Sequence, residues 1–167
     1  MITLVKVNAV FDCNVLIQAA TNSQNAASAC FRLVETKTVR LYVSKNTLSE
    51  LEEVLNRDVI KTRLKFTDEI IKEFLETVRD SAEIVAHVPH VFSLPRDVDD
   101  EEYINLAVAS KADFIVTRDR DLLDITSGYD SVSKEFRQRF KQIKIVDPLE
   151  FLSIVEKKLI EDMSINP

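Results

Sequence analysis

Five acidic residues stand at places in this sequence where a carboxylate could do chemistry. Asp12 directly follows a short apolar run, and Asp119 and Asp121 closely follow another. Asp100 lies at the start of one helical pattern, and Glu50 lies early in a second. A carboxylate at the end of a buried strand is costly unless it is paired or bound to a cation. Hard oxygen ligands select Mg²⁺ or Mn²⁺, so these acids predict a site for such an ion if the fold brings them together.

A divalent cation held in this way acts on phosphates. It can activate a water molecule as a nucleophile and stabilise charge on the scissile phosphate, and two ions about 3.5–4 Å apart can do both. The joint pattern of acids therefore favours phosphate chemistry.

Each acid also has a purely structural explanation. Negative charge at a helix start is favoured by about 0.3–1 kcal/mol, so the run from Asp97 to Glu102 could be a solvated helix start. Glu50 could be a surface glutamate, and Asp12 could cap the helix that follows it. Two observations weaken these explanations. The run places five carboxylates in six positions, where like charges repel, and Glu50 lies beside Leu51 and so close to an apolar stripe.

Hydrophobic periodicity predicts the elements that position these acids. Apolar runs predict strands at residues 7–11, 41–43, 114–117 and 144–146, with a weaker candidate at 84–85. Helical patterns are expected at 14–20, 26–36, after Ser44 through Leu55, at 67–80 and from Pro148 onward. A further helix is expected to run from Asp99 or Asp100, as its cap, through Lys111. The stretch 118–142 is charged and irregular, with one possible helix at 132–140. Strand and helix alternate with no internal repeat and no linker, which predicts one α/β domain over residues 1–167 with a mostly parallel sheet. Such folds bind ligands beyond the carboxyl ends of the strands.

Composition excludes several classes of protein. The 167 residues include one glycine, Gly128, so neither a dinucleotide-binding fingerprint nor a Walker-type phosphate loop can be built. A net charge of −6 argues against a protein that coats nucleic acid by bulk charge. Cys13 and Cys30 form no metal-like pair. The N-terminal stretch does not resemble a signal peptide and no apolar run approaches the length of a membrane span, so we expect a cytoplasmic protein without membrane contact.

Four acidic motifs, in order, resemble those of the PIN-domain family, and most of all its branch of toxin components of toxin–antitoxin systems. The resemblance covers about residues 7–155. The motifs are Val10–Leu16, Ser44–Leu55, Arg96–Tyr103 with Leu106 and Ala107, and Ala112–Leu123, followed by a family-like ending at Ile145–Leu152.

The resemblance implies a three-layer α/β/α sandwich with a mostly parallel central sheet and a metal-dependent nuclease that usually acts on RNA. It also implies that Mg²⁺ or Mn²⁺ is the cofactor. By position, Asp12, Glu50, Asp100 and Asp119 match the family's catalytic, metal-binding acids, and Asn14 and Thr117 match its supporting polar residues. Glu53, one helical turn from Glu50, could replace it.

Two of these assignments remain open. Asp99 competes with Asp100 for the third acidic position, and Asp100 is preferred because apolar residues follow it at +4, +7 and +8. Asp121 competes with Asp119 and could be a further metal ligand. Asp119 is preferred because it lies closer to the strand end.

Positive charge for a nucleic-acid substrate is expected first from Arg118 and Arg120, which flank the proposed site. Basic clusters at 57–65 and 134–144 could add to it, or could be ordinary solvated faces. His87 and His90 have no third zinc ligand near them in the sequence and are expected to serve in a loop.

The sequence thus predicts a metal-dependent endoribonuclease that is the toxin of a toxin–antitoxin pair. RNA would be its substrate, an antitoxin protein a partner, and a homodimer its assembly. One alternative is a catalytically weak or inactive PIN-like module that binds RNA or a partner. A phosphatase with Asp12 as nucleophile fits less well, because Asn14 stands where such enzymes carry a second aspartate. A phosphoacceptor domain would need paired acids after the first strand.

Overall fold

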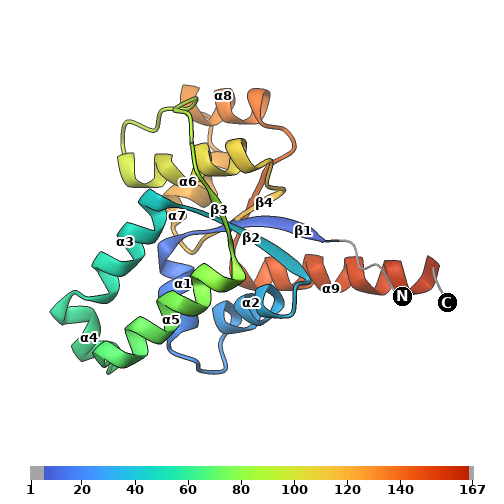
Figure 1. Ribbon diagram of the computed structural model, residues 1–167. Helices are drawn as coiled ribbons and strands as arrows, with labels where there is room; N and C mark the ends of the chain where they lie inside the picture. Colours follow the sequence, from blue (N-terminus) through green and yellow to red (C-terminus); the bar gives the residue numbers. More distant parts are fainter. Residues whose placement is uncertain (1–5, 166–167) are drawn as a thin grey trace.

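The computed structural model describes residues 6–165, which form a five-stranded, fully parallel sheet flanked by helices (Figure 1). The ends of the domain predicted over residues 1–167, namely 1–5 and 166–167, lie outside the described residues. The strand order is β3-β2-β1-β4-β5. The strands are β1 (Val7–Phe11), β2 (Val39–Ser44), β3 (Glu83–Val85), β4 (Phe114–Val116) and β5 (Lys144–Val146).

Helices cover both faces of this sheet. α6 and α8 lie on one side, and α1, α2 and α9 lie on the other (Figure 1). The helices are α1 (Cys13–Ala20), α2 (Ala26–Glu35), α3 (Lys45–Leu55), α4 (Asp58–Leu64), α5 (Asp68–Ser81), α6 (Val98–Ser110), α7 (Arg120–Leu123), α8 (Ser131–Arg139) and α9 (Pro148–Ile165), with a 3₁₀ turn η1 (Asp124–Thr126). The three-layer α/β/α sandwich expected from the sequence is confirmed. None of these helices is both long enough and apolar enough to cross a bilayer.

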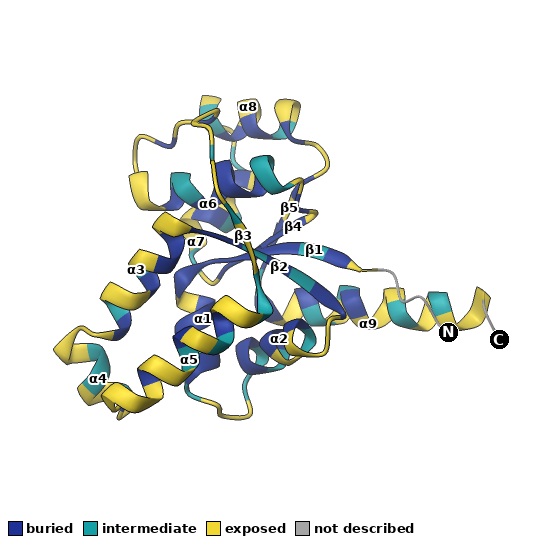
Figure 2. Cartoon of the chain, in the orientation of Figure 1, coloured by how far each residue is buried: buried dark blue, intermediate teal, exposed yellow. Residues whose placement is uncertain are grey.

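The core surrounds β1, whose apolar side chains are buried (Figure 2). On the α9 side, the ring of Phe151 lies edge-on to Phe11 and Phe114, with ring centroids 5.8 and 5.5 Å apart. On the α8 side, Phe92 packs against Phe136 and Phe140. Phe136 of α8 and Phe140, the residue that follows this helix, therefore belong to the core.

The strand order places a topological switch point between β1 and β4. From β1 the chain adds β2 and β3 on one side, and β4 and β5 then extend the sheet on the other. Phe11 pairs with Val116, so the residues that follow, Asp12 and Thr117, leave the sheet side by side. Open α/β sheets bind ligands at such a point, beyond the carboxyl ends of the strands.

Three local predictions were wrong or incomplete. α4 was not predicted, because it is only seven residues long and its contact with the core is limited to the partly buried side chains of Ile60 and Leu64. The stretch from 118 to 142 contains α7 and η1 in addition to α8. The cap of α6 is Asp97, whose Oδ1 accepts from the Asp100 amide at 3.1 Å, and not Asp99 or Asp100. The prediction placed the start of this helix too late because Val98, which is 66% exposed, adds nothing to the apolar pattern.

Candidate metal centre

Asp12 lies between β1 and α1 and is 4% exposed. It occupies the N-cap position of α1, but its side chain makes no capping hydrogen bond. Its Oδ2 instead accepts from the Thr117 hydroxyl at 2.7 Å. Burial raises the pKa of Asp12, while the bond from Thr117 opposes that rise. The capping explanation for Asp12 therefore accounts for its position but not for where its carboxylate points.

Thr117 links Asp12 to Asp119. Thr117 is fully buried, and its Oγ1 also accepts from the Asp119 amide at 2.9 Å. Asp119 Oδ1 accepts from the Asp121 amide at 2.8 Å and so caps α7. The side chain of Asp121 is exposed, and its backbone carbonyl accepts from Arg96 at 3.2 Å. That bond fastens α7 to the segment that leads into α6.

Three carboxylates from two segments converge at this edge. One oxygen each of Asp97, Asp100 and Asp119 lie within 4.8 Å of one another. Asp100 is 6% exposed, and its Oδ2 is buried without a hydrogen-bond partner. Sequence reasoning placed Asp97 only in an acidic run. Its position three residues before Asp100, typical of an N-cap, was the available signal.

The electrostatics of the cluster favour a bound cation. Burial, together with the charges of Asp12 and Asp119, raises the pKa of Asp100 to about 8. An unpaired acid in such a place is costly when ionised. The donor set is all carboxylate oxygen, which suits Mg²⁺ or Mn²⁺. The partnerless Oδ2 of Asp100 is the observation that shows that these residues fit such an ion.

Glu50 approaches from α3 and is held by a tyrosine. The Tyr103 hydroxyl, on α6, donates to Glu50 Oε2 at 2.6 Å, and Tyr103 is 2% exposed. Burial raises the pKa of Glu50, the bond from Tyr103 lowers it, and the charge of Asp12 raises it. Glu50 is therefore near the cluster without being one of its three members. No signal in the sequence pointed to Tyr103, which follows the pattern of a core residue.

Other predicted residues lie outside this cluster. Asp99 and Asn14 are exposed, and the Asn14 side chain makes no hydrogen bond to any described residue. Glu53 is exposed and pairs with Arg57 at 2.8 Å. Of the two open alternatives, the structure therefore brings Asp100 and Asp119, and not Asp99 and Asp121, to the converging carboxylates.

The histidines belong to the segment that precedes α6. His90 bonds to Glu101, whose other oxygen accepts from the Leu94 amide at 2.7 Å. Asn105 on α6 is buried, and its Oδ1 accepts from the amides of residues 91 and 92 at 2.8 and 2.9 Å. In residues 6–165 neither histidine joins a group of potential metal ligands. The loop role expected for His90 is therefore to attach the segment before Asp97 to α6 through Glu101.

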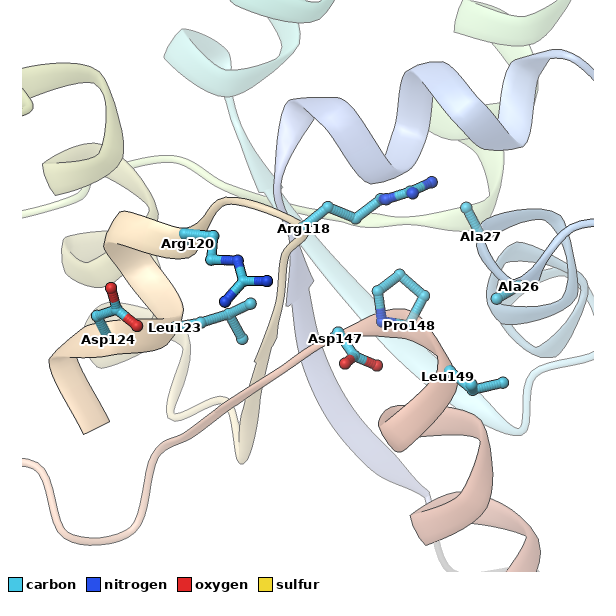
Figure 3. Close-up of a pocket in the computed structure, with 9 residues that line it drawn as sticks. All are labelled: Ala26, Ala27, Arg118, Arg120, Leu123, Asp124, Asp147, Pro148 and Leu149. Carbon is cyan, nitrogen blue, oxygen red and sulfur yellow. The ribbon is translucent and has the colours of Figure 1, made fainter. Parts of the chain in front are cut away.

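Arg118 and Arg120 lie next to the acids but face a different space. Both are exposed and line a cavity together with residues of α2 and α9 (Figure 3). Neither forms an ion pair with another residue of the described chain. The centre thus has acids at the switch point and unpaired arginines beside it.

Comparison with known proteins agrees with this geometry. A family model described as PIN domain matches residues 8–121, which include every acid discussed above. An uncharacterized protein of the archaeon Methanocaldococcus jannaschii is 27% identical over 153 residues, covering 92% of this chain and 94% of that protein.

Proposed function

The chain belongs to the PIN domain family, a superfamily of metal-dependent nucleases, and from this we propose that it is an endoribonuclease that hydrolyses RNA phosphodiester bonds with Mg²⁺ or Mn²⁺. The observation that supports this most is the convergence of Asp97, Asp100 and Asp119, with the partnerless Oδ2 of Asp100 among them. Asp12 stands beside this group through Thr117.

In this proposal Asp12, Asp100 and Asp119 hold the ion, with Asp97 as a further ligand, and Glu50 completes the acidic centre. The bound ion supplies positive charge to the phosphate and lowers the pKa of a water molecule. Thr117 fixes the orientation of Asp12, and Tyr103 fixes that of Glu50. Outer partners of this kind orient ligands and tune their basicity.

Cleavage of a labelled single-stranded RNA by the purified protein tests the proposal. We expect cleavage with Mg²⁺ or Mn²⁺ that leaves 5′-phosphate and 3′-hydroxyl ends, and none in excess EDTA. Asp12→Asn should abolish cleavage and leave the circular dichroism spectrum unchanged. Asp80→Asn, a change of the same kind at an exposed position on α5, should cut at the normal rate.

Full cleavage in EDTA, or by Asp12→Asn, would contradict the proposal. RNA binding without cleavage by the wild type would favour the inactive binding module. Hydrolysis of p-nitrophenyl phosphate without RNA cleavage would favour the phosphatase.

We further propose that this activity serves as the toxin of a toxin–antitoxin pair in the cytoplasm, with the protein acting as a homodimer. Induced expression should then arrest growth, and Asp12→Asn should not. Co-expression with the product of a short neighbouring reading frame should restore growth, and light scattering should give twice the chain mass. Growth that is equal with wild type and variant would contradict the toxin role.

A further inference from the structure

A second feature lies beside the acidic centre, on the other side of the segment that carries Asp119. It is a cavity of about 610 Å³ between α7, the start of α2 and the start of α9 (Figure 3). Arg118 extends across it toward Ala27, and Arg120 turns toward Asp147 (Figure 3). Ligand pockets of about 300–1,000 Å³ take small molecules, so this space is large enough for one nucleotide.

The cavity joins charged and apolar walls. Arg118 and Arg120 supply two guanidinium groups that are not paired with any acid in the described part of the chain. Leu123, Pro148 and Leu149 supply apolar surface, and Leu149 is 70% exposed. Guanidinium groups match phosphate in a bidentate manner, and apolar side chains can cover the face of a base. The two kinds of wall correspond to the two ends of a nucleotide.

Two acids in the same cavity argue against a simple phosphate site. Asp124 and Asp147 line it with the arginines, and Asp147 Oδ1 already accepts from the Glu150 amide at 2.8 Å. These carboxylates would repel a bare phosphate. They can accept hydrogen bonds from base amino groups or from ribose hydroxyls. A ligand with both a phosphate and such donors fits better than inorganic phosphate.

The cavity is also placed to act together with the acidic centre. Arg118 stands in the chain between Thr117, which binds Asp12, and Asp119 of the carboxylate cluster. Consecutive Cα atoms are about 3.8 Å apart, so Arg118 and Asp119 emerge from adjacent positions of one stretch of backbone. An RNA strand whose phosphodiester lies at the acids would have a neighbouring nucleotide within reach of the cavity.

We propose that this cavity binds one nucleotide of the RNA strand next to the bond that is cut. Arg118 and Arg120 hold its phosphate, Pro148 and Leu149 contact its base, and the two carboxylates accept from its hydroxyl or amino groups. This subsite rests on the proposed function, because it names how that centre would hold its substrate.

Binding of a mononucleotide without metal tests the subsite independently of cleavage. Adenosine 5′-monophosphate would be titrated into the Asp12→Asn protein in EDTA and followed by NMR chemical shifts. We expect saturable shifts at the amides of α7 and the start of α9, and weaker binding of ribose 5-phosphate and inorganic phosphate. Arg118→Ala/Arg120→Ala should weaken nucleotide binding at least about tenfold, since both charged hydrogen-bond donors to the phosphate are lost.

Two controls make the result specific. Lys157→Ala/Lys158→Ala removes the same charge from exposed positions of α9 and should leave binding unchanged. Leu149→Ala should weaken binding of the nucleotide but not of ribose 5-phosphate. Equal affinity for the arginine and lysine double variants, or shifts only at the ends of β1 and α6, would overturn the proposal.

A cleavage assay separates failure of the subsite from failure of the nuclease. An oligonucleotide cut at one position would be compared with versions that carry an abasic residue on either side of that position. An abasic residue on one side should raise KM severalfold for wild type and not for Leu149→Ala. Cleavage that is indifferent to abasic residues on both sides would overturn the subsite and leave the nuclease intact. Nucleotide binding without cleavage would overturn the nuclease and leave the nucleotide-binding site intact.

Discussion

The Thr117 hydroxyl donates to Asp12 Oδ2 at 2.7 Å, although 105 positions separate the two residues in the sequence. The bond exists because β1 and β4 pair in parallel with Phe11 opposite Val116. The same hydroxyl accepts from the Asp119 amide. One buried oxygen therefore sets the spacing between the acids that end the two central strands.

Replacing Thr117 with Val should remove both bonds while nearly preserving the shape of the side chain. We expect cleavage to fall about 10–100-fold, the usual cost of losing such an outer partner. Because the bond from Thr117 lowers the pKa of Asp12, the acid limb of the pH–rate profile should also move to higher pH. Thr117→Ser keeps the hydroxyl and should retain most of the activity. Cleavage by Thr117→Val at the wild-type rate would remove Thr117 from this role.

Tyr103→Phe should affect the centre through Glu50. The ring stays buried, but Glu50 loses a donor at 2.6 Å, and the pKa of Glu50, which that bond lowers, should rise. We expect kcat to drop about tenfold, with KM for RNA unchanged and most of the loss recovered at higher pH. Tyr129→Phe, at a position that is 89% exposed, is the matched control. A loss in both variants, or a KM effect alone, would contradict this prediction.

Asp100→Asn should change how stability depends on pH when no metal is present. The pKa of Asp100 is about 8 in the folded protein and 3.8 as the unperturbed value, so between these values the folded state binds more protons than the unfolded state. The contribution of Asp100 to the free energy of unfolding is then fully present below about pH 4. It falls as the pH rises toward 8, by up to about 1.4 kcal/mol per pH unit.

Urea unfolding in EDTA across this range is the measurement. Asp100→Asn should be more stable than wild type at pH 8, with a flatter pH dependence. Asp99→Asn, one residue away and exposed, should follow the wild-type curve. Parallel curves for wild type and Asp100→Asn would show that Asp100 is not the source of this pH dependence.

Gly128→Ala should destabilise the fold without touching the site. A Cβ at this position would collide with Ser133 Oγ and come within 2.8 Å of Asp130 Oδ2 and 3.0 Å of the Asp124 carbonyl oxygen. Ser133 is fully buried, and its hydroxyl donates to Asp130 at 2.7 Å, so it cannot simply turn away.

We expect the free energy of unfolding to fall by about 1–3 kcal/mol, as in overpacked cores, with Ser127→Ala, at an exposed neighbour, near wild type. An unchanged unfolding midpoint for Gly128→Ala would show that the neighbouring atoms can move to accommodate the added Cβ. The glycine is required here by space and not by a left-handed backbone, since the chain has no glycine at positive φ.

The sequence alone predicted the layers of the fold and the strands that end in acids. Apolar runs end at Phe11 and Val116 because these strands are buried on both faces, and an acid soon after such a run is conspicuous. The preference for Asp100 over Asp99 followed from helical periodicity, and Asp100 is the buried one. These features are local, so a single sequence contains them.

The remaining features depend on which elements become neighbours. Asp97 has the sequence signature of a cap, and it reaches Asp119 only because the starts of α6 and α7 meet in the folded protein. Tyr103 matches the apolar stripe of its helix, and its hydroxyl matters because α3 places Glu50 within reach. α4 is short and none of its residues is fully buried, so its pattern was too weak to predict a helix. No local pattern encodes strand order, so none of these contacts could be derived before the sheet was known.

The pairing of β1 with β4 has a further consequence for how the molecule is made. β1 is synthesised first, but its neighbour at the acidic edge follows about a hundred residues later. At about 5–20 residues per second, a growing chain waits roughly 5–20 s for that partner. Contacts so distant in sequence are also the slow ones to form. A chain still emerging from the ribosome therefore has no assembled acidic centre until β4 pairs with β1.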